Sequence, residues 1–391
     1  MGKKWVLFAA LMVALLDNWN AISDDSPTFG DPLPTLSSEE LDLFSQGKAE
    51  FARILTLAEG VGPVFNGRSC VACHAIPVPG GDSGVVEHRF ATVTNGAFDP
   101  MISFGGPTLQ TEGIGHVSSC TFSGETIPPE ATIIAERKTT PLFGLGLVES
   151  VPDGVFRKIA DRQQRKTPDT AGRPNAVTDV TTGLTAVGKF GWKAQVPSLL
   201  HFSAEAFHTE MGITNPFFPD DLCPQGNCAA LAACDPAADP EDDGSNVQAV
   251  ADFMRFLAPP SRPTRTSQTR FGESVFMKIG CGDCHLPALK TGRSPVKALN
   301  RVKFHPFSDF LIHDMGNLGD GFEQGDASGS EMRTAPLWGL GKRTRFLHDG
   351  SASTMEDAVL AHDGQGAASR DRFAALESKD LQNLLAFLAS L

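Results

Sequence analysis

The sequence predicts an all-α fold of two related domains in tandem, with long loops and few short strands. A C-x-x-C-H motif occurs twice, at residues 70–74 and 281–285. An internal repeat follows each motif in turn: residues 141–146 read PLFGLG and residues 336–341 read PLWGLG. Motif and repeat recur in the same order, which is typical of a duplicated domain. Apolar residues at helical spacing flank both motifs.

Helices are expected at the start and end of each domain. Ser37 and Glu40 have the spacing of a capping box at the start of a helix. Turn residues dominate residues 95–130, where we expect loops or a hairpin, after a short strand at 85–94. The prolines at 259, 260 and 263 end a helix and mark a domain boundary. The segments with helical apolar spacing are 41–55, 247–257, 271–276 and 380–391.

The two C-x-x-C-H motifs predict two covalently attached c-type haems. Two thiols add to the vinyl groups of one porphyrin, and the adjacent imidazole becomes the proximal iron ligand. A zinc site would need all four thiols on one metal, and neither a zinc site nor a redox dithiol requires a His after each pair. The attachment residues are therefore Cys70, Cys73 and His74 for one haem, and Cys281, Cys284 and His285 for the other.

The first residues resemble a signal peptide. Lys3 and Lys4 precede an apolar run at 5–16, and residues 21–23 offer a small-x-small cleavage site. We therefore expect a signal peptide at 1–23, a first cytochrome-c-like domain at 24–262 and a second at 263–391. The expected compartment is the periplasm, with no stable membrane span after the signal peptide is removed.

Charge and cysteine usage agree with export. The net charge of −13 argues against binding to nucleic acid or to an anionic membrane surface. In an oxidising compartment the four cysteines outside the haem motifs are expected to form two disulfides, and three pairings are open. These residues are Cys120, Cys223, Cys228 and Cys234.

Several further segments resemble the bacterial di-haem oxidoreductase (putative peroxidase) family, which is related to di-haem cytochrome c peroxidases and to MauG. The resemblance implies a pair of all-α haem domains, with one reactive haem and one haem that relays electrons. The segments that carry it are 141–148, 189–194, 307–316, 333–341 and 346–350.

The resemblance also indicates the sixth ligand of the second haem. In the related peroxidases this ligand lies fourteen residues after the His of an H-D-G motif, which here leads from His348 to His362. A second imidazole gives a bis-His iron suited to electron transfer. Met315 is the alternative ligand.

The first haem is expected to have an open coordination position. When the repeat is aligned with one gap, His362 falls at Lys166, which is neither His nor Met. His88 is the alternative, as a displaceable cap.

Four residues are candidates for the chemistry at the first haem. Glu149 is the candidate acid–base group, because peroxide cleavage needs a proton moved from one oxygen to the other. Trp192 is the candidate electron relay between the haems. Arg89 and Arg137 are candidates for propionate or distal-pocket contacts. For each residue, an ordinary surface or core role is the competing interpretation.

Three functions follow from these patterns. The leading one is a peroxidase, in which a small periplasmic donor such as a cytochrome c or a cupredoxin reduces the second haem and the first haem reduces hydrogen peroxide. The alternatives are an oxygenase or oxidase that uses dioxygen or peroxide on an organic or protein substrate, and a non-enzymatic electron carrier.

Overall fold

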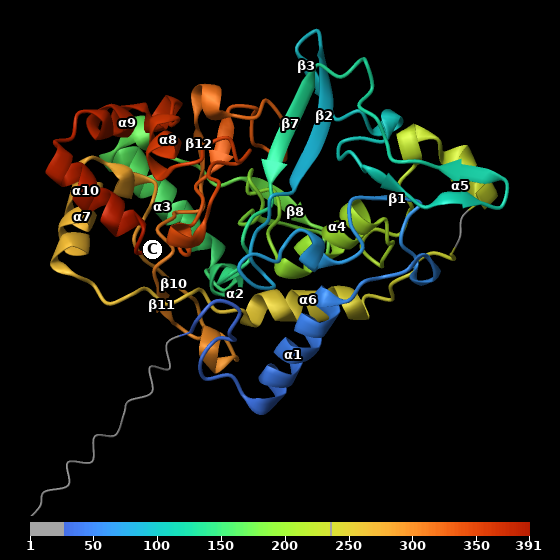
Figure 1. Cartoon of the computed structure of the whole chain (residues 1–391), viewed down its shortest axis with the longest axis horizontal. Helices are drawn as coiled ribbons and strands as arrows, with labels where there is room; N and C mark the ends of the chain where they lie inside the picture. Colours follow the sequence, from blue (N-terminus) through green and yellow to red (C-terminus); the bar gives the residue numbers. More distant parts are fainter. Residues whose placement is uncertain (1–26, 235–236) are drawn as a thin grey trace, which may run out of the picture.

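The computed structural model describes residues 27–234 and 237–391, so the predicted signal peptide lies outside the described residues. In Figure 1, α1 and α6 lie together below, β2, β3 and β7 rise at the opposite side, and α7 to α10 form a separate helical group. No helix within the described ranges has the length and apolarity needed to cross a membrane.

The α-helices range from a single turn to about four turns. They are α1 (Ser38–Ala52), α2 (Leu145–Glu149), α3 (Asp153–Lys166), α4 (Leu199–Met211), α5 (Cys228–Cys234), α6 (Ser245–Phe256), α7 (Ser267–Lys278), α8 (Met355–Leu360), α9 (Ala367–Ala374) and α10 (Ser378–Leu388).

The strands form small antiparallel sheets. β2 is the central strand of the sheet β3-β2-β7, and the other sheets are the pairs β1-β4, β5-β6, β8-β9, β10-β11 and β12-β13. The strands are β1 (Val64–Phe65), β2 (Val86–Thr94), β3 (Ala97–Asp99), β4 (Glu112–Gly113), β5 (Gly115–Val117), β6 (Cys120–Phe122), β7 (Ile133–Lys138), β8 (Ala176–Asp179), β9 (Leu184–Val187), β10 (Leu289–Lys290), β11 (Lys303–Phe304), β12 (Ile312–Asp314) and β13 (Glu331–Arg333).

The predicted all-α class is wrong. Helices account for 36% of the structure and strands for 17%, which makes the fold a mixed one. Most strands are two to four residues long, too short for an alternating pattern to stand out in the sequence. The long strand β2 was expected, but its pairing with β7 joins segments about forty residues apart, which no local pattern reveals.

The predicted helices at the domain ends are confirmed. Ser37 Oγ accepts a hydrogen bond from Glu40 N, and the Glu40 carboxylate accepts one from Ser37 N, which completes the capping box of α1. Phe44 and Phe51 of α1 pack against Phe253 of α6. In the same way, Phe276 of α7 packs against Phe387 of α10.

A glycine lets each of these helix pairs pack closely. A Cβ atom at Gly47 would lie 2.1 Å from Ala249 O of α6, and one at Gly272 would lie 2.0 Å from Asn383 O of α10. Real Cβ atoms do not approach a carbonyl oxygen this closely, so both positions require glycine. In both helix pairs, a glycine of the first helix therefore lies directly against a backbone carbonyl of the second helix.

The internal repeat has an equally specific structural role. A Cβ at Gly146, in PLFGLG, would lie 1.9 Å from Arg255 O of α6. A Cβ at Gly341, in PLWGLG, would lie 2.1 Å from Ala389 O at the end of α10. The two copies of the repeat thus make the same kind of close contact, the first with α6 and the second with the end of α10.

The largest hydrophobic cluster joins residues from both sides of the predicted boundary at 262/263. It contains Phe156 of α3 together with Phe310 and Trp338 from the C-terminal part of the chain. A second cluster lies between α7 and α10 and includes Phe276, Phe307 and Phe387. The division at 262/263 stays a prediction.

Two disulfides confirm the expectation for the remaining cysteines and settle their pairing. Cys120 pairs with Cys234, and Cys223 pairs with Cys228. Both bonds lie near β6 and α5, away from the C-x-x-C-H motifs.

The substitution Gly272→Ala tests the close packing of α7 on α10. Because the new methyl group collides with a backbone carbonyl, we expect a loss of about 1–3 kcal/mol in the free energy of unfolding. Urea unfolding followed by circular dichroism measures it. The control is Gly154→Ala in α3, where a Cβ meets nothing within 4 Å and stability should be unchanged or slightly higher. Equal stability of the two variants would contradict the packing argument.

Candidate haem sites

The two C-x-x-C-H motifs fold in the same way. Each begins with a 3₁₀ turn, η2 (Cys70–Ala72) or η6 (Cys281–Asp283). The backbone N–H of the motif's His donates to the carbonyl of its first Cys at 2.9 Å in both copies. Two thiols and one imidazole therefore reach the wall of one cavity in each case. All four thiols are free of disulfides, as attachment to a porphyrin requires.

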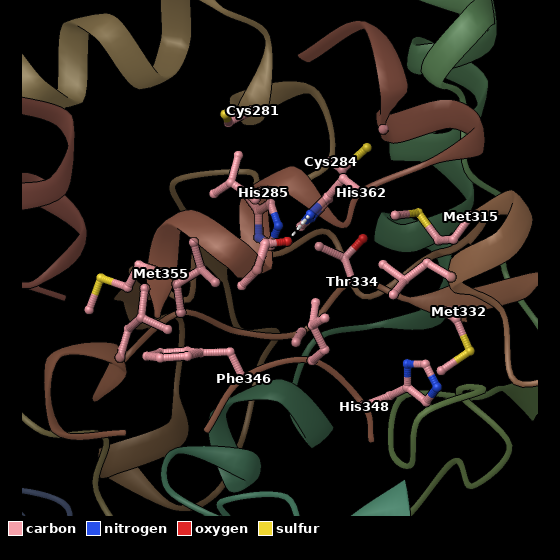
Figure 2. Close-up of a pocket in the computed structure, with 18 of the residues that line it drawn as sticks. Cys281, Cys284, His285, Met315, Met332, Thr334, Phe346, His348, Met355 and His362 are labelled. Atoms are coloured by element: carbon pink, nitrogen blue, oxygen red, sulfur yellow. Dashed lines mark hydrogen bonds between the residues drawn. The ribbon is translucent and has the colours of Figure 1, made fainter. Parts of the chain in front are cut away.

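The second motif lines a cavity of about 220 Å³ with a mostly apolar wall. Figure 2 shows Cys281, Cys284 and His285 at this cavity together with His362 and Met315, which α8 and the chain around β12 bring in. A Cβ at Gly366 would lie 3.1 Å from the nearest atom of His362 and 3.3 Å from Met315, so these two side chains are neighbours. The tertiary structure thus brings both predicted sixth ligands to the second motif.

The three candidate iron-ligating imidazoles share one hydrogen-bonding pattern. His285 Nδ1 contacts Phe307 O at 2.9 Å, His362 Nδ1 contacts Ala358 O at 2.8 Å, and His74 Nδ1 contacts Gly81 O at 3.2 Å. A carbonyl accepts only, so Nδ1 carries the proton and Nε2 keeps its lone pair. Metal-ligating histidines use this arrangement, because the backbone bond fixes the ring and its tautomer.

Burial keeps these imidazoles neutral. It lowers the pKa of His74 and of His285 to about 4 and also lowers the pKa of His362. A neutral imidazole is the form that binds iron. Burial raises the pKa of Cys70 and of Cys281 to about 12, so these thiols stay protonated. The residues present therefore fit a haem at each motif.

The first motif lines a cavity of about 210 Å³ that carries more polar groups. Its wall includes Arg89, which is almost fully buried and forms an ion pair with Glu87. Glu205 and Glu210 of α4 also line the cavity. Three carboxyl groups, those of Glu87, Glu205 and Glu210, thus line the cavity of Cys73 and His74. The charged side chains that line the second cavity are mainly basic, and Arg333 and Arg343 are among them.

Glu210 has the most perturbed carboxyl group at the first cavity. Burial, with a smaller contribution from the nearby Glu87, raises the pKa of Glu210 to about 7, although Asn66 and Arg89 act in the opposite direction. Asn66 Nδ2 donates to a Glu210 carboxylate oxygen at 3.0 Å. A carboxyl group with a pKa near 7 can both accept and return a proton at neutral pH.

Trp192 lies between the two cavities and lines both. Its indole Nε1 donates to Lys138 O at 2.9 Å, and Lys138 N donates to His348 O at 2.6 Å. The rings of Trp192 and His348 meet edge to face at 6.3 Å. The residue predicted as a relay is therefore in a position to serve that role.

A buried ion cluster fixes the backbone next to Trp192. The Asp320 carboxylate contacts Lys193 Nζ at 2.8 Å and Arg137 Nη2 at 2.7 Å. Lys193 is fully buried and also donates to the carbonyls of Ser328, Gly329 and Glu331. Burial by itself would raise the pKa of Asp320, but Arg137 and Lys193 outweigh it and hold that pKa below its ordinary value.

Other residues singled out from the sequence lie elsewhere. The Glu149 carboxylate accepts hydrogen bonds from Leu199 N and Arg255 Nε, and Glu149 is not among the residues that line either haem cavity. Lys166 does not line the first cavity, and Gln163 of the same helix α3 donates to Asp283 O of the second motif. The alignment that placed Lys166 at the first haem therefore gives no support for an open iron there.

His88 does line the first cavity. It lies on β2, and its Nε2 is 3.6 Å from Glu136 Oε1 of the paired strand β7. The side chain keeps 33% of its surface exposed. His88 thus stays a candidate cap for the first iron.

The sequence analysis missed Glu205 and Glu210, although a signal was present. Both lie in α4, which is otherwise largely apolar and ends just before Gly212. Carboxylates on a buried helix require a partner or a function. The sequence does not show which cavity this helix faces.

Residues 119–391 match a family described as "Di-haem oxidoreductase, putative peroxidase", which is most of the 391-residue chain. The chain belongs to this di-haem oxidoreductase family. The match contains the second C-x-x-C-H motif, and the first motif precedes it. Membership makes two haems the cofactors and oxidation–reduction the activity of this di-haem oxidoreductase, and it confirms the resemblance seen in the sequence.

Several solved structures are distantly similar to this chain. Hydrazine synthase of Kuenenia stuttgartiensis has a TM-score of 0.41 and 15% identity, with 100% of both chains covered. A MauG-like protein associated with microbial copper homeostasis has a TM-score of 0.41 and 15% identity over 96% of this chain and 95% of that one. The Y463M variant of the diheme peroxidase BthA from Burkholderia thailandensis has a TM-score of 0.41 and 16% identity over 89% and 85%.

TM-scores of 0.41 at 15–16% identity are too low to assign a fold or an activity to this chain. A comparison with curated proteins finds no match.

The substitution Asp320→Asn tests the ion cluster beside Trp192. Because it leaves two buried cations without their carboxylate, we expect a loss of about 3–5 kcal/mol in unfolding free energy at pH 7. The carboxylate has a lowered pKa in the folded state, so its contribution is complete above the ordinary value of 3.8 and is lost as the pH falls through the folded-state value.

Urea titrations at pH 7 and at lower pH measure this difference. Glu323→Gln, at an exposed position in the same loop, is the control. A difference between wild type and Asp320→Asn that stays constant into strong acid would refute the pairing.

Proposed function

We propose that this di-haem oxidoreductase is a periplasmic, peroxidase-like enzyme with two c-type haems. One haem is attached through Cys70 and Cys73, and the other through Cys281 and Cys284. The free thiols and the matching turns of both motifs support covalent attachment. The predicted signal peptide and the two disulfides support an oxidising, extracytoplasmic compartment.

The second haem is the electron-transfer centre, with His285 and His362 as its axial ligands. The supporting observation is that both imidazoles line one cavity with Nδ1 bonded to a backbone carbonyl. An iron with two imidazoles has no free position and is suited to electron transfer. A small periplasmic donor, such as a cytochrome c or a cupredoxin, supplies the electrons, and the net charge of −13 favours a basic or neutral one.

The first haem is the reactive centre, and Glu210 is its acid–base group. This conclusion depends on a single observation: a partly buried carboxyl group with a pKa near 7 lines the cavity of His74. Haem iron with an available position supplies the O–O bond cleavage. Reduction of hydrogen peroxide to two water molecules consumes two electrons and two protons.

The chain's own groups manage the protons. Glu210 accepts the proton of the peroxide oxygen that binds and returns it to the oxygen that leaves. The guanidinium of Arg89 is buried at the same cavity and stabilises negative charge that develops there. Glu149, the sequence-based candidate, has its carboxylate engaged by Arg255 and Leu199 N outside this cavity.

Trp192 is the relay between the two haems. It lines both cavities and is held by its bond to Lys138 O and by the Lys193–Asp320 ion pair next to it. Domain limits of 24–262 and 263–391 complete the proposal. The first repeat and α6 belong to one unit, and the second repeat and α10 belong to the other.

Electron paramagnetic resonance of the oxidised protein tests the ligand assignment. We expect the low-spin signal of the second haem to disappear in His362→Ala, because a permanent ligand is lost, and to persist in Met315→Leu. Loss in Met315→Leu alone would assign the ligand to Met315.

His88→Ala tests the cap: a change in the first haem's signal would show that His88 binds that iron at rest. Two six-coordinate haems that ignore peroxide and carbon monoxide would leave only an electron carrier.

The substitution Glu210→Gln tests the acid–base role. We expect a loss of about 10²- to 10⁴-fold in the rate of peroxide reduction, since an amide cannot carry the proton. The wild-type rate should rise with pH through about 7, as Glu210 ionises, and the variant should lack this limb. Steady-state assays with a reduced cytochrome c measure both. The same change at Glu149 should have the smaller effect, and the reverse order would restore Glu149 as the acid–base group.

A further inference from the structure

We propose that Arg333 and Arg343 form the anion site that receives the two propionates of the second haem. The inference extends the proposed function, because it assumes a haem at Cys281 and Cys284. It concerns how the chain compensates the charge of that cofactor and which end of the cavity holds its polar edge.

The two arginines lie at the wall of the second cavity and are largely withdrawn from water. Both line that cavity, and Arg333 retains only 7% of its surface. Arg333 donates from Nε to Gly191 O at 2.6 Å and from Nη1 to Thr334 O at 3.1 Å. Arg343 donates from Nη2 to Pro336 O and Trp338 O, and its buried Nε has no hydrogen-bond partner in the part of the chain that the structure describes.

No carboxylate pairs with either guanidinium among the described residues. The acidic groups that act on them are engaged elsewhere. Asp82, which acts on Arg343, forms an ion pair with Lys138. Asp309, which acts on Arg333, binds His313 and Gln163 through one oxygen.

Two unpaired, buried positive charges are costly. Arg333 and Arg343 line the same two cavities. Burial and the neighbouring charge of Arg343 together lower the pKa of Arg333 to about 10. A guanidinium does not lose its proton at neutral pH, so an anion is the remaining way to relieve the charge. A haem carries two propionates, and two negative charges match the two guanidiniums.

The first cavity is different. There, Arg89 is paired with Glu87 and Arg137 is paired with Asp320. Lys138, which lines both cavities, is paired with Asp82. The surplus of positive charge is therefore specific to the second cavity, where the relay haem is proposed.

The arginines also mark the end of the cavity that faces the first haem. Arg333 N donates to Trp192 O at 2.8 Å, and its Nε bonds to the carbonyl of Gly191 next to it. Arg333, Arg343 and Trp192 together line a small cavity of about 20 Å³. Propionates held by these arginines would therefore point toward Trp192.

Pairing with arginine has a measurable effect on the haem. A nearby positive charge favours the ferrous state, and an unpaired propionate favours the ferric state. Paired propionates stay ionised, so the reduction potential should not depend on pH between about 5 and 8. With two imidazole ligands and with its propionates paired to arginine, the second haem should have a higher reduction potential than the same haem with unpaired propionates.

Spectroelectrochemical titration of the second haem tests the proposal in the holoprotein. In Arg333→Gln and in Arg343→Gln, we expect a potential shifted to more negative values that falls as the pH rises from 5 to 8. The reason is that a buried, unpaired propionate titrates in that range. Arg333→Lys and Arg343→Lys should retain most of the wild-type behaviour. The control is Lys342→Gln, which removes an exposed charge next to Arg343 and should leave the potential unchanged.

Resonance Raman spectra of the wild-type protein and of both Gln variants provide a second test. The propionate bending modes should have the frequencies of hydrogen-bonded carboxylates, and they should shift in both Gln variants. Gln variants with the wild-type potential and pH profile would overturn the inference, as would a wild-type potential that responds to added chloride. Mass spectrometry separates the two proposals: a missing second haem defeats both, whereas two attached haems with unshifted Gln variants defeat only this one.

Discussion

The arrangement of the two haem sites depends on a single buried carboxylate. Asp320 lies in the loop between β12 and β13 and binds Arg137 of β7 and Lys193 at the same time. These three elements come from distant parts of the sequence, and between them they hold Trp192 where both cavities meet. Removing water from two cations and one anion is costly, and their close contact, together with the backbone carbonyls that accept hydrogen bonds from Lys193, compensates for it. Such a cluster tolerates little displacement, so it fixes the spacing of the two sites.

The two cavities have nearly the same size but opposite electrostatic character. The first combines a compensated arginine, Arg89, with a carboxyl group at Glu210 that is poised to exchange protons. The second is lined by His362 and by two arginines without a carboxylate partner among the described residues, Arg333 and Arg343. One environment suits a reaction that consumes protons, and the other suits an electron carrier whose charge should not depend on pH. The two cavities thus differ in the way that the proposed division of roles between the two haems would require.

Sequence reasoning succeeded wherever the signal was local. The capping box at Ser37, the helices on either side of each motif and the break at Pro259 all depend on neighbouring residues, and the structure has them. It failed where partners are far apart. Several small sheets, of which β3-β2-β7 is the largest, made the all-α class wrong. Helix α3 carries Gln163 to the second motif although this helix follows the first repeat.

The two C-x-x-C-H motifs were enough to predict haem as the cofactor of this di-haem oxidoreductase. The residues Cys281, Cys284 and His285 are adjacent in the chain, so one turn brings them together whatever the rest of the fold does. Only the tertiary structure decided which side chains surround each haem. Glu210 reached the first cavity and Arg333 the second because helices and strands distant in the sequence pack there. The pKa of a buried group depends on its burial and on the charges near it, and both are set only when the chain folds.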